Sequence, residues 1–168
     1  VQVTQIFSSY VQIFNKSQKI KDEFDLDIPN FQFETEATWI HIPGDYKEYM
    51  EDEGFNFSEA LHGALHAMIQ IAPILMQIDF HDVGGTYGID DKDQAVIHIF
   101  DAFKGGIGIA QRIYEKITNI LRMAHELIRS CRCTGKDGCP ACVIVQRCPN
   151  LNDGLSKKGA STLLDLLI

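Results

Sequence analysis

All five cysteines of this 168-residue chain lie within eighteen residues near its C-terminal end. Random placement would scatter them, so the clustering indicates a shared metal or bridge. The Gly-Cys-Pro-Ala-Cys turn lets two thiolates face one ion, and the Cys-Arg-Cys segment before it can supply two more. Four thiolates at about 2.3 Å form the closed tetrahedral shell of structural zinc, which leaves no position for water. We therefore expect zinc as the cofactor, with Cys131, Cys133, Cys139 and Cys142 as ligands and Cys148 as the substitute ligand.

Three other uses of clustered cysteines compete with zinc. A disulfide framework suits a secreted chain, whereas here the count is odd and no leader is visible. A thioredoxin-like Cys-x-x-Cys pair leaves three cysteines without a role. An iron–sulfur cluster also uses four cysteines, and the spacing alone leaves that alternative open.

The sequence carries no signal for export or for a membrane span. Residues 1–14 contain no basic residue, whereas a secretory leader begins with a basic region. The apolar stretch 71–78 is interrupted by Pro73 and Gln77 and is far shorter than the ~20 residues of a membrane helix. We expect an intracellular protein, cytoplasmic or in a eukaryote nuclear, with no membrane partner. Because the sequence begins at Val1 and not at Met, we interpret it as a piece of a longer chain.

Charge is distributed unevenly along the chain. The net charge of −8 taken alone argues against nucleic-acid binding. However, residues 1–103 hold 5 basic and 18 acidic side chains, whereas residues 104–168 hold 10 basic and 5 acidic ones. Such asymmetry is typical of a chain with one surface for a polyanion, although a solvated helix face explains it equally well. Candidate contacts to nucleic-acid phosphates are Lys104, Arg129, Arg132, Lys136 and Arg147, with Arg112, Lys157 and Lys158 as further members of a basic patch.

The N-terminal third of the chain has the composition of strands. Residues 1–14 and 31–42 are rich in β-branched and aromatic residues, which predicts an antiparallel pair. The charged residues 16–27 between them are expected to form a turn. Residues 45–54 are acidic and are expected to form a loop or a short helix.

Helical periodicity begins near Ser58. Apolar residues then recur every three or four positions as far as Leu75, with Ser58 as the expected N-cap and a kink expected at Pro73. Asp-Val-Gly-Gly at residues 82–85 predicts a loop, and residues 95–100 predict a short strand.

A second long helix is expected over residues 108–130 and a final helix over residues 156–167, with Ser156 as its N-cap. The predicted fold is therefore α+β, with N-terminal antiparallel strands, a helical core with a short strand, a tetracysteine zinc knuckle and a C-terminal helix. We expect a strand-rich part (1–54) and a helical zinc-binding part (55–168) within one compact unit.

Two further groups of residues could carry chemistry. His62 and His66 lie one helical turn apart, and with Asp82 and Asp101 they form a possible polar site. A metal-dependent hydrolase using His62, His66 and Asp101 is one hypothesis, and histidines that are simply hydrogen-bonded beneath the glycine turns are the more ordinary one. The glycine turn at residues 105–108 opens a helix and could contact a phosphate, but it lacks a nucleotide-binding spacing.

The cysteine pattern, followed by Leu-Ser-Lys-Lys-Gly-Ala at residues 155–160, resembles the C-terminal zinc-binding (MZB) domain of the mitomycin repair factor A helicases. Residues 33–39, 61–67, 82–85 and 100–108 resemble further segments of that domain, in the same order. The sequence departs from the family pattern at Leu65, where many relatives have an acidic residue.

This resemblance implies an accessory domain of an ATP-dependent DNA helicase of the DEAD/DEAH-box superfamily two, acting in DNA repair. The domain, held in shape by its zinc, would brace the motor, its partners would be the helicase core domains of the same chain, and it would contact single-stranded DNA. The chain itself contains no phosphate-binding loop and no Asp-Glu-x-His motif, so we expect no catalytic activity from it, and any ATPase motor lies outside it. The alternative that the resemblance leaves open is a zinc-containing interaction module of a phage-defence or regulatory protein.

Overall fold

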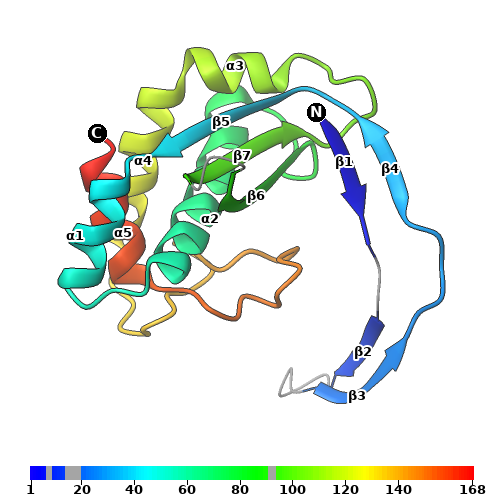
Figure 1. Ribbon diagram of the computed structural model, residues 1–168, viewed down its shortest axis with the longest axis horizontal. Helices are drawn as coiled ribbons and strands as arrows, with labels where there is room; N and C mark the ends of the chain where they lie inside the picture. Colours follow the sequence, from blue (N-terminus) through cyan, green and yellow to red (C-terminus); the bar gives the residue numbers. More distant parts are fainter. Residues whose placement is uncertain (7–8, 14–19, 91–93) are drawn as a thin grey trace.

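The computed structural model describes residues 1–6, 9–13, 20–90 and 94–168, and it has an α+β fold (Figure 1). The N-terminal strands form two ladders that curve away from the helical body (Figure 1). Strand β1 (Gln2–Gln5) pairs antiparallel with β4 (Phe31–Glu34), and β2 (Ser9–Ile13) pairs antiparallel with β3 (Ile20–Asp25). The expected antiparallel pairing of residues 1–14 with residues 31–42 is confirmed for β1 and β4 only, since β2 pairs with β3.

The prediction of a turn over residues 16–27 is wrong, because β3 lies within it; residues 16–19 are outside the described residues. The charged residues are compatible with a strand here, because the side chains of β3 that the structure describes are exposed and remain in contact with solvent. Tyr10 of β2 stacks on Phe24 of β3 with ring centroids 5.0 Å apart, which is a cross-strand pair of the kind that stabilises a ladder.

A three-stranded antiparallel sheet forms the centre of the molecule in the order β5-β7-β6. Its strands are β5 (Ala37–Ile42), β6 (Val83–Ile89) and β7 (Ala95–Asp101). The short strand expected at residues 95–100 is confirmed, whereas the loop expected at residues 82–85 is wrong. Asp82 precedes β6, and residues 83–85 begin it. The two glycines allow close packing: a Cβ on Gly84 would collide with the ring of Phe100, and one on Gly85 would collide with Leu65.

Helix α2 (Phe57–Met76) is the central helix and packs against β6, β7, α4 and α5. Its N-cap is Asn56, whose side chain accepts a hydrogen bond from the backbone N–H of Glu59 at 3.1 Å. The predicted N-cap, Ser58, is therefore two residues too late. The helix continues through Pro73 to Met76, because a proline in the last turn removes little of the hydrogen bonding. The acidic segment before it contains a short helix, α1 (Gly44–Asp52).

The long helix predicted over residues 108–130 is two helices, α3 (Ile109–Glu115) and α4 (Ile117–Ser130), which meet at Lys116. Helix α3 packs on the sheet strands β5 and β7, whereas α4 packs on the helices α2 and α5 (Figure 1). The two segments therefore cover different parts of the core. The final helix is confirmed as α5 (Lys157–Leu166), with the Ser156 hydroxyl accepting from the Gly159 N–H at 3.1 Å. None of the described helices combines the length and hydropathy needed to cross a membrane.

Candidate metal centre

The structure brings four cysteine sulfur atoms together in one cluster. The Sγ atoms of Cys131, Cys133, Cys139 and Cys142 all lie within 4.8 Å of one another. Three Sγ–Sγ distances are 3.5 Å (Cys131–Cys139), 3.7 Å (Cys133–Cys142) and 3.8 Å (Cys139–Cys142). A tetrahedron with metal–sulfur bonds of about 2.3 Å has edges of about 3.8 Å. The donor set therefore fits one zinc ion in a closed, four-thiolate shell.

The local backbone explains why these residues converge. Cys131 follows the last residue of α4 in an extended conformation, which directs the chain away from the helix. In the Cys-Pro-Ala-Cys turn, the Cys142 N–H donates to the Cys139 carbonyl at 2.9 Å, and the Cys139 N–H donates to the Cys142 sulfur at 3.2 Å. Gly138 precedes this turn with a φ of 82°, and a Cβ there would collide with Val143. Only glycine satisfies both conditions.

The thiols differ in how readily they lose a proton. Burial raises the pKa of the Cys142 thiol to about 12. Hydrogen bonding from the Cys133 backbone, followed by that from the Cys139 side chain, lowers the pKa of Cys131 to about 7. Zinc binds thiolates, so a divalent cation has to displace the proton of Cys142, and binding of the metal is coupled to proton release.

Lys157 at the start of α5 holds the cysteine segment from outside. Its Nζ donates to the carbonyls of Cys131 at 2.7 Å and Cys133 at 2.9 Å, and lies 3.3 Å from the Cys133 sulfur. Four thiolates around Zn²⁺ carry a net charge of −2, which this ammonium group partly balances. From the sequence, Lys157 was predicted to belong to the basic patch. The spacing of the residues does not show that α5, which begins fifteen residues after Cys142, packs back against the cysteines.

Helix α2 holds the same segment from the other side. The Gln70 side chain donates to the Cys142 carbonyl at 3.0 Å, and Nδ1 of His66 lies 2.7 Å from the Val143 carbonyl. Burial lowers the pKa of His66 to about 4, so its ring is neutral at physiological pH. Gln70 was not identified from the sequence, because an isolated glutamine on a helix carries no motif.

Cys148 lies apart from the four-cysteine cluster and beside the two histidines of α2. One ligand atom each from His62, His66 and Cys148 lies within 4.8 Å of the others, and all three residues are buried. Nε2 of His62 is 3.3 Å from the Cys148 sulfur. The structure thus unites His62 and His66 as the sequence suggested, but with Cys148 and not with a carboxylate.

Asp82 and Asp101 belong to neither group of potential metal ligands among the described residues. The fully buried Asp101 accepts hydrogen bonds from the backbone N–H groups of Ile107, Ile109 and Ala110, which open α3. These amides are the ones that a phosphate at the glycine turn would need, so Asp101 takes the place of an external anion. Asp82 accepts from the Asp79 N–H at 3.2 Å. A hydrolytic site of His62, His66 and Asp101 is not formed.

The candidate DNA-contacting residues are all exposed but do not form one patch. Arg129 and Arg132 flank Cys131, and Lys136 lies in the cysteine segment, where it is 3.6 Å from Glu59. Arg147 lies close enough to Asp79 to help lower the pKa of that carboxyl, although the N–H of His81 is the main cause. Lys104 lies at the β7–α3 connection, at the opposite end of the molecule from the loops after α4 (Figure 1).

Comparison with known proteins identifies the domain. The family model of the MrfA Zn-binding domain matches residues 64–143, which include the four clustered cysteines. An uncharacterized protein of Methanocaldococcus jannaschii is 35% identical over 114 residues, which are 64% of this chain and 99% of that protein. The chain belongs to the MrfA Zn-binding domain family. Zinc is accordingly the metal of this domain, and an iron–sulfur cluster is not required to explain the cysteines.

Longer relatives of this MrfA Zn-binding domain are helicases. The ATP-dependent helicase hrq1 of Schizosaccharomyces pombe is 24% identical over 169 residues, which are 92% of this chain and 16% of that protein. The solved structure of the DUF1998 helicase MrfA bound to DNA shares the fold, with a TM-score of 0.65 and 21% identity over 99% of this chain and 21% of that one. The chain thus spans about a sixth of the curated helicase and about a fifth of the solved one.

Proposed function

We propose that this MrfA Zn-binding domain is the C-terminal accessory module of an ATP-dependent DNA helicase in DNA repair. In this proposal Cys131, Cys133, Cys139 and Cys142 bind a structural zinc ion that holds the neighbouring basic residues in place. Those residues contact the phosphates of single-stranded DNA, and the rest of the domain braces the motor domains of the same chain. The observation that carries the proposal is that Arg129 and Arg132 lie on either side of the zinc ligand Cys131.

The names of the relatives support the helicase part of the proposal. Two curated relatives that cover 92% of this chain are ATP-dependent helicases, and the MrfA helicase whose fold the chain shares was solved with bound DNA. In each case this chain corresponds to a small part of the protein, so the ATPase motor is assigned to the remainder.

The geometry supports a phosphate contact beside the zinc. Arg129 is exposed, and its ion pair with Glu126 at 3.8 Å is also exposed, so that pair contributes little stability and a phosphate can replace the carboxylate. Arg132 and Lys136 are exposed on the segment that the zinc site closes. A fixed backbone reduces the entropy that these side chains lose on binding, which is how a structural metal can favour contact with DNA.

The test is binding of a labelled single-stranded oligonucleotide to the chain at increasing salt concentration. The double variant Arg129→Glu/Arg132→Glu should bind more weakly. In a plot of log affinity against log salt concentration, its slope should be shallower by about 0.7 for each phosphate that the variant no longer neutralises. Arg122→Glu is the matched control, because Arg122 is also an exposed arginine of α4 but lies two turns from the cysteines. Lys104→Glu measures separately whether the β7–α3 connection adds a phosphate contact.

Equal losses of affinity in Arg122→Glu and in the double variant would contradict a specific contact beside the zinc and indicate a diffuse charge effect. Binding that does not depend on salt would contradict the DNA proposal itself.

A second candidate function, contact with another protein or protein domain, is favoured by the N-terminal ladders. Tyr10 of β2 and Phe24 of β3 stack on each other while 48% and 40% exposed. Strands β2 and β3 lie away from the helical body (Figure 1). Absence of DNA binding by the chain, together with loss of motor binding in Tyr10→Ser/Phe24→Ser, would favour this interaction role over DNA contact.

A further inference from the structure

His62, His66 and Cys148 form a buried group on the side of α2 that faces the loop after the cysteine turn. Their exposed fractions are 2%, 3% and 7%, and one ligand atom of each lies within 4.8 Å of the others. The two imidazole rings meet edge to face with centroids 4.3 Å apart. Two imidazoles and one thiol, all potential metal ligands, thus converge in the protein interior, outside the four-cysteine cluster.

Hydrogen bonds to the backbone set the tautomer of both histidines. Nδ1 of His62 lies 3.0 Å from the Gly154 carbonyl, and Nδ1 of His66 lies 2.7 Å from the Val143 carbonyl. A carbonyl oxygen only accepts, so each Nδ1 must carry the proton, and each Nε2 is left with its lone pair. Imidazoles that bind metals are held in this same way, by a hydrogen bond from the other ring nitrogen.

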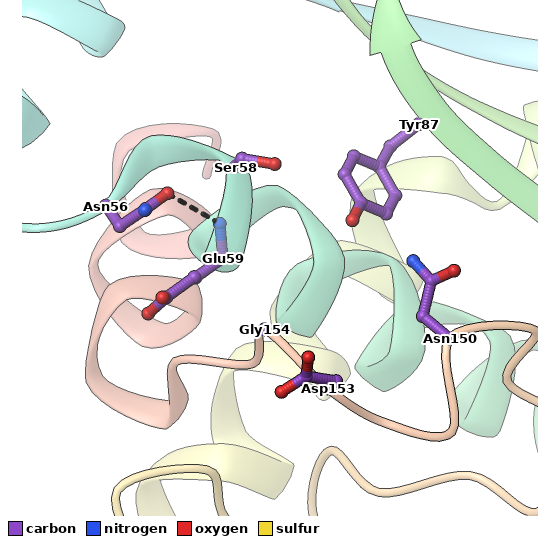
Figure 2. Close-up of a pocket in the computed structure, with 7 residues that line it drawn as sticks. All are labelled: Asn56, Ser58, Glu59, Tyr87, Asn150, Asp153 and Gly154. Carbon is purple, nitrogen blue, oxygen red and sulfur yellow. Dashed lines mark hydrogen bonds between the residues drawn. The ribbon is translucent and has the colours of Figure 1, made fainter.

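The third ligand and the surroundings complete this arrangement. The Cys148 sulfur is already 3.3 Å from Nε2 of His62, so a metal ion would replace the thiol proton that the two atoms share. The ring of Tyr87 stacks on His62 with centroids 5.1 Å apart, and a pocket of about 530 Å³ lies beside it. Figure 2 shows Tyr87, Asn150, Asp153 and Gly154 around this pocket; Tyr87 and Gly154, which contact His62, line the pocket, whereas His62, His66 and Cys148 do not.

We propose that His62, His66 and Cys148 bind a second zinc ion, with a water molecule as the fourth ligand. Two imidazoles and one thiolate suit zinc, whose catalytic and open sites commonly have three protein ligands. One thiolate leaves this centre with a net charge of +1, opposite to the −2 of the four-cysteine centre. The two centres adjoin through the backbone, since His66 binds the carbonyl of the residue that follows Cys142. The alternative to a metal ion is a hydrogen bond between the Cys148 thiol and the His62 imidazole, which would attach the loop that contains Cys148 to α2.

The test is the zinc content of the full 168-residue chain after saturation with zinc and removal of the excess. We expect about two ions per chain in the wild type, and about one in Cys148→Ala and in His62→Gln. His125→Gln is the matched control, because His125 lies on α4, partly buried and 3.8 Å from Asp165, outside both groups, and it should retain two ions. A wild-type chain with one ion that is unchanged in Cys148→Ala would overturn the proposal and leave the thiol–imidazole hydrogen bond.

A spectroscopic measurement on the wild type keeps the test decisive if a variant fails to fold. X-ray absorption of the zinc-saturated wild type should show nitrogen as well as sulfur neighbours, whereas a single four-cysteine site gives sulfur alone. Scattering from sulfur neighbours alone in the zinc-saturated wild type would overturn the second centre.

Discussion

At the scale of single residues, Lys157 is the one basic side chain that the structure places against a sulfur atom of the cluster, among the described residues. Lys157 donates to two cysteine carbonyls and lies beside one sulfur, so it both fixes the cysteine backbone and offsets the negative charge of the thiolates. Hydrogen bonds that involve a charged group contribute about 1.5–3 kcal/mol each, more than neutral ones.

We predict that Lys157→Met lowers the affinity for zinc by about 10- to 100-fold, the range found when an outer partner of a metal ligand is removed. The measurement is competition with a chromophoric chelator. Lys158→Met is the control, because Lys158 is the exposed neighbour on the same helix and should retain wild-type affinity. Equal affinity in Lys157→Met and the wild type would show that the cysteine segment needs no support from α5.

At the scale of elements, strand β6 shows how tightly the sheet approaches the central helix. Gly85 lies against Leu65 and Ile69 of α2, so that a Cβ would be 2.5 Å from the Leu65 side chain and 3.2 Å from the His98 carbonyl. Gly88 of the same strand has nothing within 4 Å of the position of a Cβ.

We therefore predict that Gly85→Ala lowers the free energy of unfolding by about 1–3 kcal/mol, because the added methyl group overpacks the interface of β6 and α2. Gly88→Ala should leave stability unchanged or slightly raised, since alanine restricts the unfolded chain more than glycine does. Chemical denaturation of both variants measures this difference. Similar midpoints for the two would contradict the close packing.

The elements also show which parts of the fold the sequence could predict. Periodicity sufficed for α2, α5 and β7, and the clustering of cysteines sufficed to bring Cys131, Cys133, Cys139 and Cys142 together. Strand β6 was missed because Gly-Gly is typical of a loop, and only the approach of Phe100 and Leu65 explains glycine in a strand. The break at Lys116 was missed because α3 and α4 continue one apolar stripe but pack on different partners. The place of Cys148 depends on α2, which no local pattern could supply.

At the scale of the whole molecule, the cysteine cluster connects segments that are far apart in the sequence. Cys142 and Val143 are fully buried in the core, and α2 binds this turn through Gln70 and His66. Helix α5 binds the other pair of cysteines, Cys131 and Cys133, through Lys157. Removal of the metal should therefore loosen two helices and the turn between them, and not only the turn.

We predict that Cys139→Ser, or treatment of the wild type with a strong chelator, lowers the melting temperature sharply. Structural zinc supplies about 10–16 kcal/mol of apparent binding free energy in small domains, which equals or exceeds the roughly 5–15 kcal/mol total stability of a typical protein. Thermal melting followed by circular dichroism measures the change, and readdition of zinc to the chelated wild type should restore it. An unchanged melting curve would show that the core is stable without the metal.

The position of the ligands in the sequence determines how the metal can stabilise the molecule. The four cysteines run from Cys131 to Cys142, so the ion closes only a short loop. In the chain-entropy model of cross-links, a loop of this size contributes about 3 kcal/mol by restricting the unfolded chain. That contribution is a minor share of the free energy that a zinc ion can supply, so the remainder has to come from interactions within the folded protein. We therefore expect the ion to stabilise the domain chiefly as a rigid anchor, to which Gln70, His66 and Lys157 attach two distant helices.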